Sequence, residues 1–182
     1  ANAYGHGMLA VADRLDAEAD MFAVAMPEEA YALREAGCVK PVVVLHGFAN
    51  IKELEKFSSL GLCTIVHQQS QLDCLLQSRL PAAIDVWLKV DTGMHRLGVS
   101  PAEVDYYFAQ LRNCRNVSKV SVMSHFANMD EVDNKFNNSQ LESFIKATYD
   151  IDAECSMANS AAIMRLPAAH FEMVRPGIML YG

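Results

Sequence analysis

The chain has 182 residues, of which 52% are hydrophobic and 20% are charged. This composition is typical of a folded globular protein and not of a disordered one. Its 15 Lys+Arg against 22 Asp+Glu give a formal net charge of −7, which argues against nucleic acid as the main partner because phosphate binding needs clustered basic residues. No apolar run reaches the roughly 18–20 residues of a membrane span, so we expect no membrane partner.

Short apolar runs alternate along the chain with longer segments of helical period, which predicts strands separated by helices. In chain order we expect a helix at 8–15, a strand at 21–25, a helix at 27–36, a strand at 42–45, a helix at 51–60, a strand at 64–66, a helix at 70–78, a strand at 84–90, a helix at 101–112, a strand at 120–125, a helix at 135–147, a weaker strand at 152–157, a short helix at 160–166 and a seventh strand at 171–174. Pro27 and Asn50 fit helix starts, and Gly37 fits a helix end.

Strands that are apolar on both faces and separated by helices predict an α/β protein with a parallel sheet. Two architectures compete, an open doubly wound sheet and a (β/α)₈ TIM-type barrel. We favour the barrel, in an incomplete form, because a full barrel takes about 250 residues and eight strands. The chain begins where a first strand would just have ended, and both ends look like cuts through ordered structure. Residues 1–182 are therefore expected to form one partial barrel domain with no second domain.

Five cysteines are scattered along the chain without a Cys-x-x-Cys pair. A disulfide framework or a zinc site needs ligands at short, repeated spacings, so we expect no metal and no disulfide. Buried structural thiols in a reducing compartment are the simpler interpretation, and they favour a cytoplasmic location.

Polar clusters follow several predicted strands, at the edge where parallel strand–helix folds build their active sites. The clusters lie at 4–7, 89–96, 124–127, 159–162 and 175–178. Each has a simpler interpretation. Gly5 and Gly7 could only shape a turn, Ser160 could only cap a helix, and His125 could be a core histidine. Ser160 at a helix start together with Gly177 also fits a phosphate-binding site.

Three basic residues fall on the same predicted edge. Lys89 lies within an apolar strand and must be buried, which is costly for an ammonium group unless it is paired or chemically altered. Arg96 and Arg175 could be surface ion-pair partners. Together in an acidic protein, however, the three cations indicate a site for an anion. The chain has no His-Glu-x-x-His and no Gly-x-Ser-x-Gly, so neither a metal site nor a serine hydrolase is indicated.

Taken together, the motifs resemble the bacterial alanine racemase family. The resemblance rests on Ala-Asn-Ala-Tyr-Gly-His-Gly at 1–7, Trp-Leu-Lys-Val-Asp-Thr-Gly-Met-His-Arg-Leu-Gly at 87–98, Ser-His-Phe-Ala at 124–127, Asn-Ser-Ala at 159–161 and Val-Arg-Pro-Gly-Ile-Met-Leu-Tyr-Gly at 174–182. It extends from the first residue to the last. The most specific parts are the run at 91–98 and the Arg-Pro-Gly-Ile segment.

The resemblance implies an enzyme that interconverts L-alanine and D-alanine through a pyridoxal-phosphate aldimine and supplies D-alanine for peptidoglycan. It implies a (β/α)₈ barrel followed by a C-terminal β-domain, in a homodimer. The two catalytic bases would be a Schiff-base lysine and a tyrosine from the partner subunit.

The resemblance also implies roles for individual residues, which come after the motifs that they match. Tyr4, Asn159, Ser160, Gly177 and Ile178 would bind the cofactor, mostly at its phosphate. Arg175 would face the pyridine nitrogen, with His125 behind it. Arg96 would contact the cofactor and the substrate carboxylate. Lys89 matches a lysine that is carbamylated in some members, which would turn a buried cation into an anion that orients Arg96.

The sequence departs from the family pattern at both ends. The Schiff-base lysine is expected just upstream of the Ala-Asn-Ala motif, and the catalytic tyrosine in the C-terminal domain, so neither base lies in this chain. We therefore expect a racemase fragment that is inactive alone. The alternatives are a broad-specificity or serine racemase of the same family, and a non-catalytic pyridoxal-phosphate-binding barrel protein.

Overall fold

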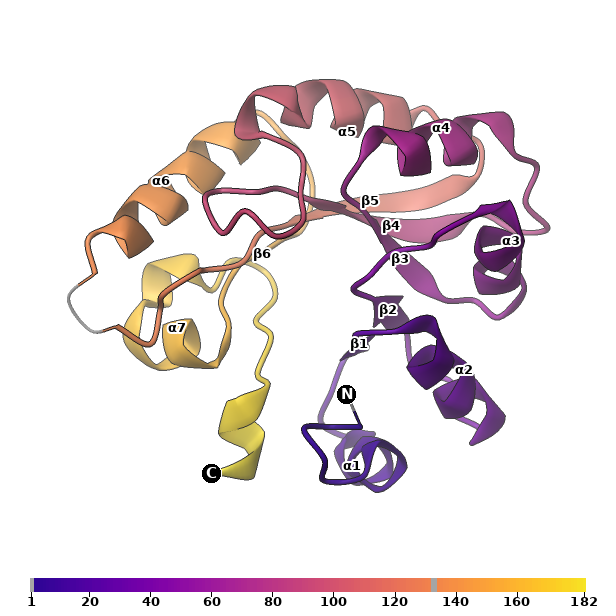
Figure 1. Ribbon diagram of the computed structural model, residues 1–182, viewed down its shortest axis with the longest axis horizontal. Coiled ribbons are helices and arrows are strands. Elements are labelled where there is room, and N and C mark those ends of the chain that lie inside the picture. The colour runs from indigo at the N-terminus through magenta and orange to yellow at the C-terminus, as the bar shows by residue number, and fades with distance from the viewer. Residues whose placement is uncertain (1, 132–133) are drawn as a thin grey trace. The chain divides into compact units, whose positions relative to one another are not determined.

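A computed structural model describes residues 2–131 and 134–182 of the chain (Figure 1). Helices and strands alternate along most of it, as the apolar pattern predicts. The elements are α1 (Met8–Leu15), β1 (Phe22–Val24), α2 (Pro27–Glu35), β2 (Val42–Val44), α3 (Ile51–Ser59), β3 (Cys63–Val66), α4 (Gln69–Gln77), β4 (Ile84–Lys89), η1 (Pro101–Glu103), α5 (Val104–Arg112), β5 (Val117–Met123), α6 (Phe136–Thr148), β6 (Cys155–Ser156), α7 (Ser160–Arg165), η2 (Pro167–Ala169) and η3 (Ile178–Tyr181).

The strands form one sheet in the order β1-β2-β3-β4-β5-β6. The pairs β1–β2, β2–β3 and β5–β6 are parallel, with Phe22 opposite Val42 in the first. A doubly wound sheet reverses its strand order at a switch point, whereas a barrel adds each strand next to the previous one. The sequential order therefore decides between the two predicted architectures in favour of part of a (β/α)₈ barrel. None of the helices in the described part of the chain is long and apolar enough to cross a bilayer.

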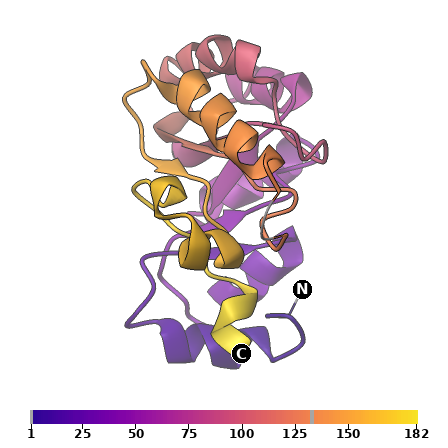
Figure 2. The same ribbon diagram turned by 90° about the vertical axis from the view of Figure 1, so that its left-hand side faces the viewer.

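The chain divides into two compact units, each with its own core. The first unit comprises residues 1–86 and 114–119 and is packed around Leu33, Leu54, Phe57, Ile65, Leu72 and Leu75. The second comprises residues 87–113 and 120–182 and is packed around Leu88, Leu111, Phe126, Phe144 and Met157. In the second unit the C-terminal segment, yellow in Figure 2, lies close to α7, which the hydrogen bonds of Ser160 described below explain.

The predicted seventh strand at 171–174 is wrong for the described chain. Only one isolated bridge forms there, between Met173 and Ser156. Phe171 has a φ of +51°, which is left-handed and incompatible with an extended strand. The prediction of a strand at 120–125 is also shifted, because β5 begins at Val117. Its first residues are partly or fully exposed, so an apolar pattern could not reveal them.

The predicted helix boundaries hold where a specific residue ends the helix. Gly37 has a φ of +87°, and its N–H donates to the Arg34 carbonyl as α2 ends. The Asn50 side chain accepts a hydrogen bond from the Glu53 N–H at 3.1 Å and so caps α3. The cysteine prediction is confirmed for three free thiols, Cys63, Cys114 and Cys155, whereas Cys38 and Cys74 are only partly buried.

Arg34, near the end of α2, connects the segments that follow α2 and α3 in the first unit. Its guanidinium donates to the carbonyl oxygens of Cys38 at 2.8 Å, Lys40 at 2.8 Å, Leu60 at 3.0 Å and Gly61 at 2.9 Å. Replacing Arg34 with alanine leaves these acceptors without their donor. We expect the free energy of unfolding of the intact protein to fall by about 2 kcal/mol, as measured by urea denaturation.

The control for this substitution is Arg79→Ala, because Arg79 is exposed and lies in a loop of the same unit. We expect the control to change the free energy of unfolding by less than about 0.5 kcal/mol. Equal losses in the two variants would show that the four hydrogen bonds contribute nothing specific.

Candidate functional site

Three strands end at polar residues that belong to the second unit. Lys89 is the last residue of β4, Ser124 and His125 follow β5, and Asn159 and Ser160 follow β6. Because β5 and β6 are parallel, their carboxyl ends meet at one edge of the sheet. The predicted clusters of this unit therefore gather at the edge where barrels build their sites.

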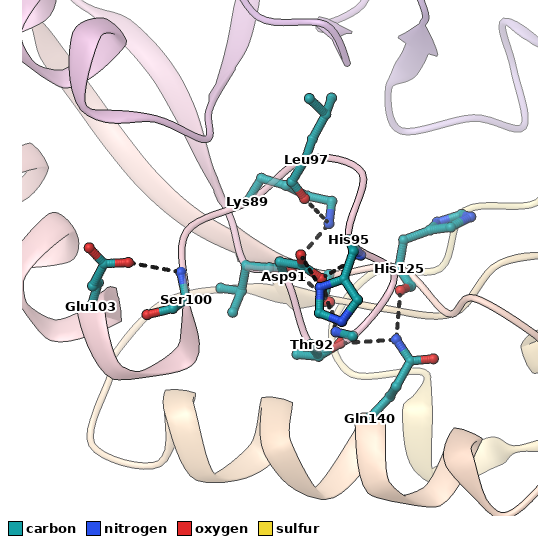
Figure 3. Close-up of polar contacts among 12 residues, drawn as sticks. Lys89, Asp91, Thr92, His95, Leu97, Ser100, Glu103, His125 and Gln140 are labelled. Carbon is teal, nitrogen blue, oxygen red and sulfur yellow. Dashed lines mark hydrogen bonds and ion pairs between the residues drawn. The ribbon is translucent and has the colours of Figure 1, made fainter.

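Lys89 is buried, with 8% of its surface exposed, which confirms the prediction from its strand. Its Nζ donates to the carbonyl oxygens of Val90 at 3.0 Å and Leu97 at 3.3 Å (Figure 3). Burial, followed by the charge of Arg175, lowers the pKa of Lys89 to about 8. Near pH 8 about half of the Lys89 side chains are therefore neutral amines, which are nucleophilic.

Asp91 organises the loop that follows β4. Its Oδ1 accepts hydrogen bonds from the N–H groups of Gly93 at 2.9 Å and His95 at 3.0 Å, and its Oδ2 lies 3.2 Å from the His95 Nδ1. Burial acts to raise the pKa of the Asp91 carboxyl, but the hydrogen bonds from His95 and Gly93 outweigh it and keep that pKa below its usual value. The loop is therefore anchored on an ionised carboxylate.

Gly98 closes the same loop at a position where no side chain fits. Its φ is +139°, and a Cβ there would lie 2.4 Å from the Asp91 backbone nitrogen. After Gly98 the chain returns to the strand end, where the Val99 N–H donates to the Lys89 carbonyl at 2.9 Å. Residues 92–98 thus form a loop that leaves the end of β4 and returns to it.

Arg96 projects from this loop and is exposed. Among residues 2–131 and 134–182 its side chain has no hydrogen-bond or ion-pair partner. Its charge nevertheless acts on the buried groups, because it helps to lower the pKa values of Lys89 and His125. Arg96 is therefore an available cation at the edge of the site.

Arg175 connects the ends of β5 and β6. Its Nη2 donates to the Ser124 carbonyl at 2.6 Å and to the Met157 carbonyl at 3.4 Å, and its Nη1 donates to the Ser156 hydroxyl. Desolvation lowers the pKa of Arg175 to about 10, so the guanidinium remains charged at neutral pH. It is a fixed cation held by acceptors from two strand ends, not a surface ion-pair partner.

His125 lies with its Nδ1 3.4 Å from the Arg175 Nη2. A guanidinium can only donate, so Nδ1 accepts and the imidazole carries its proton on Nε2. Burial, followed by the charges of Arg175, Lys89 and Arg96, lowers the pKa of His125 to about 3. His125 is therefore a neutral imidazole at physiological pH, in a defined tautomer.

Ser160 does not cap α7, because the Asn159 side chain does so by accepting from the Ala162 N–H at 3.1 Å. The Ser160 Oγ instead accepts hydrogen bonds from the N–H groups of Gly177 at 3.0 Å and Met179 at 3.3 Å. Its own hydroxyl proton remains available for donation. The structure therefore brings together Ser160 and the segment that contains Gly177 and Ile178.

Tyr4 belongs to the other unit and is described separately from the cluster. It lies in an exposed turn with a φ of +54° and 59% of its surface accessible. Gly5 and Gly7, with φ values of +89° and +94°, shape this turn as the simpler interpretation predicts.

Two residues of the cluster were not singled out from the sequence. Ser156 is fully buried and accepts from Arg175, and Gln140 is fully buried in α6 and contacts the His125 carbonyl. A signal existed for Gln140, because it shares the apolar face of α6 with Leu141 and Phe144. A polar side chain at a core-facing helical position must find partners inside the protein. For Ser156, in a short strand, we find no such signal.

The fold and the cluster define a barrel-type α/β domain with a cationic site at the carboxyl ends of its strands. The chain belongs to the alanine racemase family, because the family model "Alanine racemase, N-terminal domain" matches residues 1–182. Among curated relatives, the alanine racemases of Mannheimia succiniciproducens and Thioalkalivibrio sulfidiphilus are 45% and 48% identical, over 100% of this chain and 51% of theirs.

Solved structures give the same result. The biosynthetic alanine racemase from Pseudomonas aeruginosa is 41% identical with a TM-score of 0.95, covering 100% of this chain and 51% of that protein. The alanine racemase of Clostridium difficile 630 in complex with cycloserine is 29% identical with a TM-score of 0.90, covering 100% of this chain and 52% of that protein. The chain therefore spans about half the length of the relatives it matches.

Proposed function

We propose that this chain is the cofactor-binding half of an alanine racemase that interconverts L-alanine and D-alanine with pyridoxal phosphate. The observation that carries the proposal is the set of three cations, Lys89, Arg96 and Arg175, around a neutral His125 in a domain of this family. The Asp91 carboxylate acts against these charges at Lys89, where it raises the pKa. We call the longer protein that contains these residues the parent racemase.

The donor set fits the chemistry of this cofactor. An anionic phosphate needs hydrogen-bond donors, and the Ser160 hydroxyl proton is available because its Oγ accepts from the N–H groups of Gly177 and Met179, which also hold the hydroxyl in place. Asn159 caps the first turn of α7, which begins at Ser160, and Ile178 lies between Gly177 and Met179 in the sequence. We propose that these residues of the second unit hold the phosphate.

When bound, pyridoxal phosphate withdraws electrons from the α-carbon of the amino acid attached to it. Arg175 is proposed to face the ring nitrogen. Because its guanidinium stays charged and does not give up a proton, it would leave that nitrogen largely unprotonated and would limit side reactions. The neutral His125 helps to hold the guanidinium by accepting a hydrogen bond from one of its N–H groups.

Arg96 is proposed to hold the substrate carboxylate, because it is the exposed cation of the cluster. Lys89 is proposed to carry a carbamate. Its neutral amine attacks CO₂, one N–C bond forms, an electron pair of a C=O bond moves to oxygen, and the nitrogen passes one proton to water. The resulting anion would orient Arg96 and would remove the cost of the buried ammonium.

The rest of the proposal concerns the parent racemase. Its two catalytic bases, a lysine and a partner tyrosine, are proposed to lie outside residues 1–182, in a cytoplasmic homodimer that supplies D-alanine for peptidoglycan. Because racemisation needs a base on each face of the substrate, the 182-residue chain alone should not catalyse it.

The proposal is tested by incubating L-alanine with each protein and pyridoxal phosphate, and by resolving the enantiomers by chiral chromatography. We expect the parent racemase to approach an equal mixture and the 182-residue chain to form no D-alanine. L-serine and L-lysine are the control substrates, and faster turnover of either would contradict the assignment to alanine. D-alanine formed by the short chain would contradict the placement of the two bases.

A further inference from the structure

Gln140 connects two loops at the site from a fully buried position in α6. Its Nε2 donates to the His125 carbonyl at 3.3 Å and to the Thr92 Oγ1 at 3.4 Å, as Figure 3 shows. Its Oε1 accepts from the Ala127 N–H at 2.9 Å. One amide thus holds the backbone on both sides of Phe126 and reaches the loop that follows β4.

The loop after β4 is itself attached to the loop after β5. The Thr92 and Ser124 hydroxyls lie 2.8 Å apart, and the Ser124 Oγ donates to the Val90 carbonyl at 2.9 Å. Thr92 and Ser124 are 8% and 0% exposed, so water does not compete for these groups. Buried polar networks of this kind are satisfied only in one arrangement, which makes them rigid.

The His125 imidazole depends on this backbone for its orientation. Among the described residues, its ring has one polar contact, the long hydrogen bond from Arg175. Ser124 on one side is held by Arg175 through its carbonyl, and Ala127 on the other side is held by Gln140. If the backbone at His125 and Ala127 relaxed, no second contact would keep Nδ1 facing the guanidinium.

We propose that Gln140 is a positioning residue of the racemase, which fixes the backbone at His125 and thereby holds the imidazole against Arg175. This inference rests on the function proposed above, since it assigns Gln140 to the same reaction. Gln140 itself touches neither the substrate nor the cofactor in this role. It acts through the two backbone groups that it binds.

The role needs both halves of the amide. A glutamate at this position keeps the acceptor for the Ala127 N–H but has no ionised-state donor for the His125 carbonyl. A methionine keeps the approximate length and volume of the side chain and loses both hydrogen bonds. Gln140→Glu and Gln140→Met therefore remove one or both contacts, and the milder variant serves if the other fails to fold.

Gln71 offers a matched control in the first unit. It lies in α4, is 3% exposed, donates to the Phe48 carbonyl at 3.1 Å and accepts from the His67 N–H at 3.0 Å. It therefore connects the loops after two successive strands in the same way, without contacting His125. Gln71→Met should lower the free energy of unfolding by a comparable amount and leave the His125 imidazole unchanged.

The experiment uses the parent racemase with 15N-labelled histidine, and the His125 signal is assigned from its loss in His125→Asn. We expect Gln140→Met to shift the His125 ring signals and to raise the pKa of His125 by about one pH unit or more, because the imidazole moves away from the Arg175 charge. We expect kcat to fall about tenfold or more with KM changed less than about threefold, a larger loss than Gln71→Met gives.

Two results would overturn the inference. One is unchanged His125 signals and pKa in both Gln140 variants. The other is a loss of kcat that Gln71→Met reproduces at equal loss of urea stability, because that pattern reflects destabilisation only. If the wild-type parent does not racemise alanine, the proposed function fails, whereas the His125 spectrum still decides whether Gln140 positions the imidazole.

Discussion

Replacing Arg175 with leucine is expected to lower the free energy of unfolding of the parent racemase by about 3 kcal/mol or more. The Arg175 guanidinium donates hydrogen bonds to the Ser124 carbonyl, the Met157 carbonyl and the Ser156 hydroxyl. All three of these residues are fully buried, so water cannot replace the lost donor. Each unsatisfied buried acceptor costs about 1 kcal/mol or more, and urea denaturation followed by fluorescence measures the sum.

The same substitution should raise the pKa of His125 from its value of about 3. Burial lowers this pKa most, and the Arg175 charge is the next cause. Leucine removes the charge, so histidine-selective NMR should show titration at higher pH. Arg175→Lys keeps the charge but loses the planar fork, so we expect it to lose stability while keeping the pKa of His125 low.

Arg165 provides the control for Arg175 within the same unit. It also donates to backbone carbonyls, those of Met129 at 3.4 Å and Asp130 at 3.0 Å, but it is exposed. Arg165→Leu should cost less than about 1 kcal/mol and leave His125 unchanged, because water satisfies the freed carbonyl of the exposed Asp130 and the hydrogen bond to the buried Met129 is long. Similar losses for Arg165→Leu and Arg175→Leu would show that the burial of the acceptors is unimportant.

Replacing Lys89 with methionine is expected to stabilise the parent racemase at pH 7 in CO₂-free buffer while strongly reducing racemisation. The fall of the Lys89 pKa from 10.5 to about 8 corresponds to roughly 3 kcal/mol of unfavourable burial of the charged form. Methionine has a similar volume and no charge, and such replacements often stabilise by about 1–4 kcal/mol. Activity should fall because the proposed anion that orients Arg96 cannot form.

The sign of the pH dependence follows from the lowered pKa. Below pH 8 the lysine is protonated in both the folded and the unfolded state, so the cost is constant. Between pH 8 and 10.5 the folded state loses its proton first, and the stability of the wild type rises relative to Lys89→Met. The advantage of the variant should therefore shrink across this range.

Lys146 in α6 is exposed and provides the control for Lys89. Lys146→Met should show no such change between pH 8 and 10.5. In 13C-bicarbonate, wild type should show a carbamate signal that Lys89→Met lacks. A variant that is less stable than the wild type at every pH would contradict the account of the buried ammonium.

Local patterns predicted the parts of the site that depend on one element. The burial of Lys89 follows from the apolar residues around it in β4, and the order of helices and strands follows from periodicity. The pairing of His125 with Arg175 joins residues 50 positions apart and depends on how β5 and β6 are placed in the sheet. Neither residue carries that information in its local sequence. The partners were expected only because the motifs resembled a known family.

Ser160 shows the same limit at shorter range. Its position at a helix start fitted either a cap, which is the commonest use of serine there, or a phosphate site together with Gly177. Asn159, one residue earlier, takes the capping role, and the Ser160 hydroxyl is left for the N–H groups of Gly177 and Met179. Competition between two adjacent capping residues is settled by backbone geometry, which spacing alone does not determine.

The loop from Asp91 to Gly98 is ordered by contacts that it makes with itself. Its carboxylate gathers two N–H groups, and a left-handed glycine turns it back toward β4. Fixing the backbone of each such residue costs about 1–2 kcal/mol of conformational entropy at room temperature. In this loop the entropy cost is met when the protein folds and not when a ligand binds. If Arg96 binds an anion as proposed, the anion would meet a backbone that is already ordered, and mainly the Arg96 side chain would lose freedom on binding.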